Sequence, residues 1–162
     1  MERQSAGAKD CEEKIIKQYS DMVYRLAFAR VGTKHDADEV FQEVFLRFLK
    51  KKPIFRGEEH CKAWFIRVTI NCSKSFWSSP WRKNIQPIAD DIAFETKESI
   101  DLCSELKKLP PKYREVIHLF YYEDMSIEEI GRILHRKNST IRTQLTRARA
   151  KLKTFMKEED YV

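Results

Sequence analysis

Apolar residues recur at helical spacing along the first half of the chain. The first stripe comprises Ile15, Ile16, Tyr19, Met22, Val23, Leu26 and Ala27. It stops at "VGTKHD", where Gly32 suits a helix end, and Thr33 with Asp36 three residues on suits the start of another helix. The second stripe comprises Val40, Phe41, Val44, Phe45, Phe48 and Leu49. The pattern predicts two consecutive amphipathic helices.

The second predicted helix ends at "KKKP", because lysines suit a helix C-terminus and Pro53 cannot continue the helix. The loop "PIFRGEE" follows, in which Gly57 permits a tight turn. A third helix is predicted from about Cys61 to Trp77. Glycine and proline are scarce and strict alternation is absent, so no strands are expected.

A second set of helices is predicted after residue 101. "LPPKYREVIHLFYY" begins a helix with Pro110 and Pro111 at its N-terminal edge. Ser126 and Glu129 form a capping-box pattern that opens a short helix. A turn through "HRKN" leads to a helix whose buried side is Ile141, Leu145, Ala148 and Leu152. A short helix, a tight turn and a second helix form a helix-turn-helix.

An acidic segment separates these two groups of helices. In "IQPIADDIAFETKESID" five acidic residues stand against only Lys97. We interpret residues 84–101 as a linker between a domain at 1–83 and a domain at 102–162. The predicted fold class is therefore all-α, with two small helical domains joined by an acidic linker.

The chain carries a formal net charge of +6 and has a pI near 9.1, which favours a polyanionic partner, although an acidic membrane surface would suit the same balance. Residues 132–153 contain eight Lys or Arg and no acid. Within this stretch a set of polar and guanidinium side chains projects from the second helix of the helix-turn-helix: Arg142, Thr143, Thr146 and Arg147. We predict that this face contacts DNA in the major groove, the alternative being a solvated face.

A second basic stretch interleaves aromatic and cationic residues. "HCKAWFIRVTINCSKSFWSSPWRK" has five Lys or Arg, no acid after residue 60, and three tryptophans. This combination suits unpaired bases. Trp64, Arg67, Asn71 and Lys74 fall in one helical sector, although a core position for Trp64 is the alternative. The helix "DADEVFQEVFLRFLKK" differs, because its acidic outer side would repel DNA; that side is either solvated or docks on a protein.

Other classes of site find little support in the sequence. No run of about 18 apolar residues occurs, and the N-terminus lacks the apolar core of a secretory signal, which predicts a cytoplasmic protein without membrane insertion. The cysteines form no CxxC pair, so reduced thiols and no metal site are expected. Scattered histidines and the absence of a phosphate-binding glycine loop predict no catalytic residues, no cofactor and no enzyme activity.

Three motifs in order resemble the extracytoplasmic function (ECF) sigma factors of bacterial RNA polymerase, in the sigma-70 superfamily. "DADEVFQEVFLRFL" resembles region 2.2, and "FRGEEHCKAWFIRVTINCSKSF" resembles regions 2.3 and 2.4. "LPPKYREVIHLFYYEDMSIEEIGRILHRKNSTIRTQLTRARAKL" resembles region 4. The resemblance implies a factor that binds core polymerase and directs promoter-specific initiation, recognising the minus-ten element with region 2 and the minus-thirty-five element with region 4.

The resemblance also implies roles for individual residues. The residues that would dock on the clamp helices of the largest polymerase subunit are Asp38, Glu39, Gln42 and Glu43. Those that would contact the minus-ten element are Arg56, His60, Lys62, Arg67, Asn71 and Lys74, with residues 56–62 as a pocket loop and Asn71 beside a flipped base. Those that would contact the minus-thirty-five element are Arg142, Thr143, Thr146, Arg147 and Arg149. The polymerase flap region and an anti-sigma factor, often membrane-bound, are further implied partners.

Two other functions fit parts of the sequence. A stand-alone repressor or activator would use only the helix-turn-helix and would give no role to the acidic helix. A structural or RNA-binding helical protein would bind by charge alone, so its affinity would fall steeply with salt and show no sequence preference.

Overall fold

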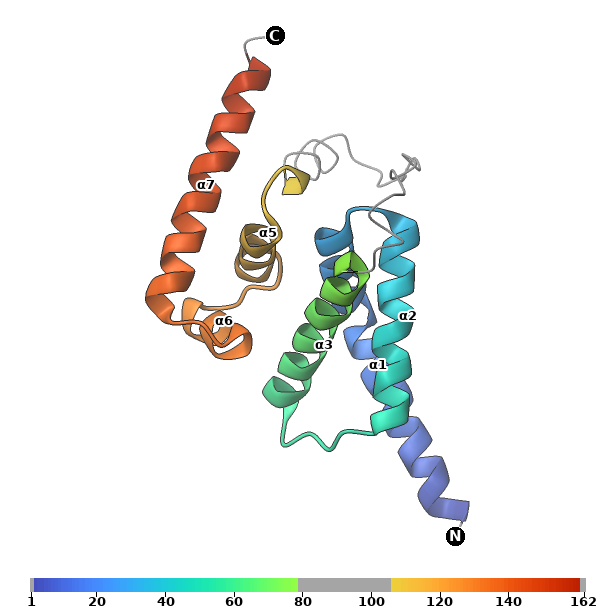
Figure 1. The fold of residues 1–162 in the computed structure, drawn as a ribbon. Helices are drawn as coiled ribbons and strands as arrows, with labels where there is room; N and C mark the ends of the chain where they lie inside the picture. Colours follow the sequence, from blue (N-terminus) through green and yellow to red (C-terminus); the bar gives the residue numbers. More distant parts are fainter. Residues whose placement is uncertain (1, 79–105, 161–162) are drawn as a thin grey trace. The chain divides into compact units, whose positions relative to one another are not determined.

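The computed structural model describes residues 2–78 and 106–160, and these residues form helices and no strand. The elements are α1 (Glu2–Val31), α2 (Lys34–Lys51), α3 (Glu58–Ser78), α5 (Pro111–Ile117), the π-helix η1 (His118–Tyr122), α6 (Ile127–Leu134) and α7 (Asn138–Asp160) (Figure 1). The all-α prediction is confirmed. The predicted linker, 84–101, lies outside the described residues.

The chain divides into two compact units. The first comprises Met1–Phe28 and His35–Pro87, and the second comprises Ala29–Lys34 and Ile88–Val162. Each unit has its own buried apolar side chains, as two small helical domains require.

An aromatic cluster around Phe65 holds the first unit together. Phe65 in α3 is fully buried, and its ring lies 5.2 Å from Tyr19 in α1 and 5.3 Å from Phe48 in α2, measured between ring centroids. Trp64 packs against the same cluster, with its ring 5.0 Å from Phe65 and 5.9 Å from Phe55. Trp64 therefore contributes to packing, which was the alternative to base contact.

The ends of the first helices follow the predicted signals, with one exception. Gly32, at φ +83°, occupies the left-handed region between α1 and α2, and α2 ends at Lys51, just before Pro53. The loop before α3 makes its left-handed step at Lys52, with φ 45°, and not at Gly57. The carbonyl of Gly57 instead accepts a hydrogen bond from the Cys61 N–H at 3.1 Å, so Gly57 marks the start of α3.

In the second unit the predicted helix-turn-helix is present. Ser126 caps α6, since its Oγ accepts a hydrogen bond from the Glu129 N–H at 3.1 Å and the Glu129 carboxylate accepts one from the Ser126 N–H at 3.4 Å. His135 ends α6 in the left-handed region. At Gly131 an added Cβ would lie 2.8 Å from the Arg136 carbonyl oxygen, so the turn passes too close to α6 for a side chain there.

The helix that starts at Pro111 differs from its prediction in its second half. The sequence predicted one helix through "LPPKYREVIHLFYY", but α5 ends at Ile117 and the chain continues as the wider π-helix η1. Val116, Ile117 and Leu119 are buried, whereas Tyr121 and Tyr122 are exposed. A π-helical turn often lies at a functional site.

The stability of the first unit should fall as the pH rises from about 9 to 12. Burial, followed by the nearby Cys61, raises the pKa of Tyr19 from 10.0 to about 12, and burial raises the pKa of the Cys61 and Cys72 thiols above 9.0. Since these groups lose protons at lower pH in the unfolded chain, alkaline pH favours unfolding. Urea unfolding followed by tryptophan fluorescence should show this loss. Tyr19→Phe should make it shallower above pH 10, and an unchanged slope in that variant would contradict the assignment to Tyr19.

Candidate functional site

One surface of α7 carries four of the side chains predicted to contact DNA. Arg142, Thr143, Thr146 and Arg147 are all exposed. At about 100° per residue they lie within a sector of about 140°, and the buried Ile141 and Leu145 lie outside it. The first turn of α7 contains no acidic residue, so the partial positive charge of the helix N-terminus is not offset there. This arrangement attracts anions.

The two threonines of this surface have their hydroxyl protons already engaged. The Thr143 hydroxyl donates to the Ser139 carbonyl and the Thr146 hydroxyl donates to the Arg142 carbonyl, each at 2.9 Å. Each oxygen therefore retains lone pairs and can accept a hydrogen bond. Among major-groove base edges, the amino groups of adenine and cytosine are the matching donors.

Arg149 lies on the same side of α7 as Arg142, two turns further along the helix. Its Nε donates a hydrogen bond of 2.6 Å to the hydroxyl of Tyr121 in η1. Its guanidinium carbon lies 5.6 Å from the Phe120 ring centroid and 5.4 Å from that of Tyr121. No sequence pattern indicates that Tyr121 contacts the recognition helix, because Tyr121 and Arg149 are separated by 28 positions.

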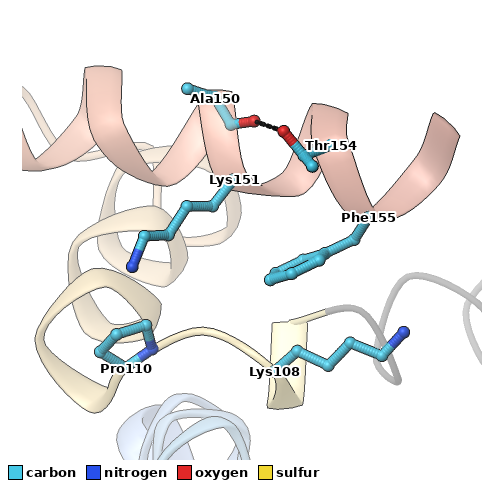
Figure 2. A pocket seen from close by; sticks show the side chains of 6 residues that line it. All are labelled: Lys108, Pro110, Ala150, Lys151, Thr154 and Phe155. Atoms are coloured by element: carbon cyan, nitrogen blue, oxygen red, sulfur yellow. Dashed lines mark hydrogen bonds between the residues drawn. The ribbon is translucent and has the colours of Figure 1, made fainter. Parts of the chain in front are cut away.

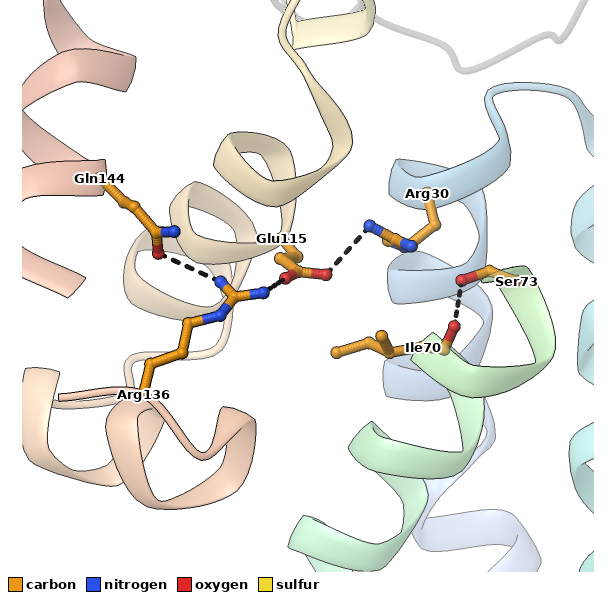
Figure 3. A network of polar contacts seen from close by, with 6 residues as sticks. All are labelled: Arg30, Ile70, Ser73, Glu115, Arg136 and Gln144. Carbon is orange, nitrogen blue, oxygen red and sulfur yellow. Dashed lines mark hydrogen bonds and ion pairs between the residues drawn. The ribbon is translucent and has the colours of Figure 1, made fainter. Parts of the chain in front are cut away.

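A buried carboxylate lies beneath the helix-turn-helix. The Glu115 side chain is 1% exposed and forms an ion pair with Arg136 in the turn between α6 and α7 (Figure 3). Arg136 also donates from Nη1 to the Gln144 side-chain oxygen at 3.1 Å, which connects the turn to α7. The other Glu115 oxygen accepts a hydrogen bond from Arg30 at 2.9 Å, in the short segment that groups with the second unit.

The burial of this network has an electrostatic consequence. Burial lowers the pKa of Arg30, and the carboxylate of Glu115 opposes that effect. A buried guanidinium stays charged only where such a partner compensates for the lost hydration. Glu115 therefore supports two arginines at once. The sequence indicated neither the Glu115–Arg136 pair nor the Glu115–Arg30 pair, since Arg136 is one of several cations in a basic stretch.

The predicted minus-ten residues of α3 fall on two sides of that helix. His60, Arg67, Asn71 and Lys74 lie within a sector of about 60° and span about 21 Å of helix axis, roughly the length of six base pairs. Lys62, between the buried Cys61 and Ala63, lies about 140° around the helix from Arg67. The structure thus groups four of the predicted residues and separates Lys62 from them.

The loop residue Arg56 is tied to the start of α3. Its backbone N–H donates a hydrogen bond of 3.1 Å to Nδ1 of His60, and the His60 ring packs edge-on against Phe55 at 5.6 Å between centroids. This contact fixes the backbone of the predicted pocket loop, while the Arg56 side chain remains exposed.

The outer surface of α2 combines acidic and apolar residues. Gln42 and Glu43 are exposed, and Asp38 and Glu39 are half-buried. Leu46 and Leu49 are 50% and 42% exposed and extend the stripe Glu39, Gln42, Leu46 and Leu49 along the helix. Leu49, which belongs to the apolar stripe of the predicted helix, lies at the exposed edge of that stripe, beside the acidic residues. Exposed leucines next to a charged patch indicate a protein interface.

A shallow groove of about 450 Å³ lies beside the C-terminal half of α7 (Figure 2). It is lined by Lys108, Pro110, Ala150, Lys151, Thr154 and Phe155. Lysine ammonium groups flank aromatic rings here: Lys108 lies 5.6 Å from the Phe155 centroid and Lys151 lies 5.1 Å from the Tyr113 centroid. The groove lies beyond the α7 residues predicted to contact DNA.

Residues 2–78 and 106–160, which the structure describes, lack two features. None of their helices combines the length and the apolar character needed to cross a membrane. No three His, Cys, Asp or Glu residues among them gather into a group able to hold a metal ion.

Comparison with known families matches both units. Residues 15–83 match the model "Sigma-70 region 2", and residues 102–152 match the model "Sigma-70, region 4". The chain is 30% identical over 152 residues to the RNA polymerase sigma factor SigV of Bacillus subtilis, covering 90% of each protein. It is 27% identical over 157 residues to the ECF RNA polymerase sigma factor SigE of Mycolicibacterium smegmatis, and spans 61% of the length of that relative.

Solved structures share the fold. The sigma factor RpoE of Bartonella quintana, crystallised with the anti-sigma factor NepR, gives a TM-score of 0.77 at 20% identity, over 92% of this chain and 98% of that one. CnrH, in complex with the cytosolic domain of CnrY, gives a TM-score of 0.67 at 21% identity, over 94% of both chains.

Removing the Glu115 carboxylate should destabilise the second unit strongly. Glu115→Gln leaves Arg136 and Arg30 without their shared counter-ion, and we expect a loss of about 3 kcal/mol in the free energy of unfolding. Arg136→Met leaves Glu115 with Arg30 and should cost less. The double variant should lose less than the sum of the two single variants, because the pair is coupled.

The measurement is urea unfolding of the full chain, with amide hydrogen exchange to assign the loss to residues 106–160. The control is Glu43→Gln, which breaks the exposed pair between Glu43 and Arg47 and should cost less than about 1 kcal/mol. Strictly additive losses from Glu115→Gln and Arg136→Met would show that the two side chains do not depend on each other.

Proposed function

Because the chain belongs to the ECF sigma factors of bacterial RNA polymerase, we propose which of its surfaces bind the polymerase and which bind the promoter. The protein binds core polymerase and directs promoter-specific transcription initiation. The observation that carries the residue assignments is the pair of exposed basic faces, on α3 and on α7, in units that match regions 2 and 4. We place the domain boundaries at 1–83 and 102–162, with 84–101 between them.

Region 4 binds the minus-thirty-five element through α7. Arg142 and Arg147 present guanidinium groups that can pair with guanine edges or phosphates. Thr143 and Thr146 present acceptor oxygens, because their protons are donated to the backbone. The helix N-terminus adds a favourable site for a phosphate. These contacts position the factor on duplex DNA before the strands separate.

Region 2 binds the minus-ten element through α3 and the loop before it. Asn71 lies at one edge of the sector formed with His60, Arg67 and Lys74 and is exposed, and we assign it to the captured base. Binding of unpaired bases favours melting, because the bound single strand offsets the lost pairing and stacking. The Arg56 side chain contacts the DNA phosphate backbone near the pocket loop. Lys62, on another side of the helix, contributes only to the overall positive charge.

Polymerase binding uses the outer surface of α2. Asp38, Glu39, Gln42 and Glu43 provide the polar contacts to the clamp helices, and Leu46 and Leu49 add apolar area that loses contact with water in the complex. We assign the groove beside Phe155 to the flap region, since it offers an apolar floor away from the DNA-contacting residues.

The chemistry of RNA synthesis belongs to the polymerase, so we assign no enzymatic activity to this chain. Its site of action is the cytoplasm, where bacterial polymerase and promoter DNA are found. An anti-sigma factor is a further partner, because RpoE and CnrH, which share the fold, were solved with NepR and with the cytosolic domain of CnrY.

The proposed function predicts protein-dependent transcription from selected promoters. Core polymerase and a randomised promoter library should give run-off transcripts only when this protein is added, and those transcripts should share two spaced sequence elements. A second sigma factor serves as the positive control for the core. If a competent core gives no transcripts with this protein, the stand-alone DNA-binding function gains support.

Two sets of substitutions should separate polymerase binding from promoter opening. Gln42→Ala with Glu43→Ala should weaken association with the core by about tenfold, since both polar contacts are lost. The matched control is Glu13→Ala with Gln18→Ala, on the exposed side of α1.

Asn71→Ala should keep core binding and lower open-complex formation, measured by permanganate reactivity of the selected promoter. If the Asn71→Ala variant opened the promoter as well as the wild-type chain does, the assignment of Asn71 to the flipped base would be wrong.

A further inference from the structure

Arg149 is held in a defined orientation by two aromatic residues of η1. Its Nε donates to the Tyr121 hydroxyl at 2.6 Å, and both the Phe120 and Tyr121 rings lie within 6 Å of its guanidinium carbon. The two rings pack edge-on against each other, with centroids 5.0 Å apart. A long side chain that would otherwise sample many rotamers therefore has a fixed hydrogen bond and two ring contacts.

This orientation leaves the outer edge of the guanidinium available for a ligand. Tyr121 engages Nε, so the two terminal nitrogens keep four N–H donors in a fork that matches two oxygens of a phosphate. Arg149 is exposed, and Tyr121 is 51% exposed. The Tyr121 hydroxyl accepts from Arg149 and can still donate its own proton.

The position of Arg149 on α7 favours a phosphate over a base. It lies within about 20° of Arg142 around the helix, but about 10 Å further along the axis. In a helix-turn-helix the N-terminal residues of the recognition helix contact base edges in the major groove. A side chain two turns further along the helix lies toward the edge of the groove, where the phosphates are.

We propose that Tyr121, supported by Phe120, positions Arg149 as a preoriented contact to a backbone phosphate of the minus-thirty-five duplex. This inference rests on the proposed function of α7. It adds η1 to the DNA interface and gives Arg149 a different task from Arg142 and Arg147. Arg149 contributes affinity for any sequence, and Tyr121 acts through Arg149.

The test uses the full chain assembled with core polymerase on a fluorescent promoter duplex selected in the run-off experiment. Affinity is measured between about 50 and 200 mM salt. The variants are Tyr121→Phe, Arg149→Ala and the double variant. Tyr122→Phe is the matched control, because Tyr122 is a neighbouring exposed tyrosine whose ring stacks on His118. Thermal unfolding of each variant should match the wild-type chain.

Tyr121→Phe keeps the ring and removes the hydrogen-bond acceptor, so we expect binding about threefold to tenfold weaker. Arg149→Ala should lower the slope of log K against log salt by about 1, on promoter and non-promoter duplexes alike. In the Arg149→Ala background, Tyr121→Phe should have no further effect, and Tyr122→Phe should bind as the wild-type chain does.

Three results would overturn the inference and leave the proposed function intact. These are wild-type affinity for Tyr121→Phe, equal losses in Tyr121→Phe and Tyr122→Phe, and an additive loss in the double variant, which would make Tyr121 an independent DNA contact. An Arg149→Ala variant with an altered base preference and an unchanged salt slope would also overturn it. If the wild-type chain with core polymerase binds no duplex, the proposed function itself fails and this inference fails with it.

Discussion

The helix-turn-helix of this sigma factor depends on one buried carboxylate. Glu115 in α5 is only 1% exposed, and its ion pair with Arg136 fixes the turn between α6 and α7. Arg136 in turn donates to Gln144 on the recognition helix. An unpaired charge at this depth would cost several kcal/mol, so the turn cannot move away without a large penalty. The direction of α7, and with it the position of the α7 side chains predicted to contact DNA, follows from that constraint.

The first unit reaches the same end by a different means. There the ring of Phe65 packs against Tyr19 of α1 and Phe48 of α2. This packing fixes the rotation of α3 about its axis, which directs Asn71 outward and Cys72 inward. The apolar cluster and the basic face are therefore two sides of one helix, and each substitution in the cluster also changes how the basic face is presented.

Local signals in the sequence predicted the helices, whereas contacts between residues far apart in the sequence could not be predicted. The capping box at Ser126 and the turn at Gly32 involve neighbours, so short spacings were enough to find them. The sequence does not distinguish Arg136 from the exposed arginines around it, because the ion pair of Arg136 depends on Glu115 in α5, which lies 21 residues earlier. Leu49 fits an apolar stripe but lies at its solvent edge, since a stripe wider than the contact surface leaves one side uncovered. Nothing in the residues around Tyr121 indicates its contact with Arg149.

The distribution of charge within the basic stretch also limits how strongly region 4 can bind DNA by charge alone. Residues 132–153 contain eight Lys or Arg, but Arg136 is neutralised by Glu115 and serves the fold. Lys151 lies against the ring of Tyr113, on the side of α7 that faces the groove. The number of phosphates that this unit neutralises must therefore be smaller than its formal charge. Since the salt dependence of binding follows the number of neutralised phosphates, specificity has to come from a few positioned side chains.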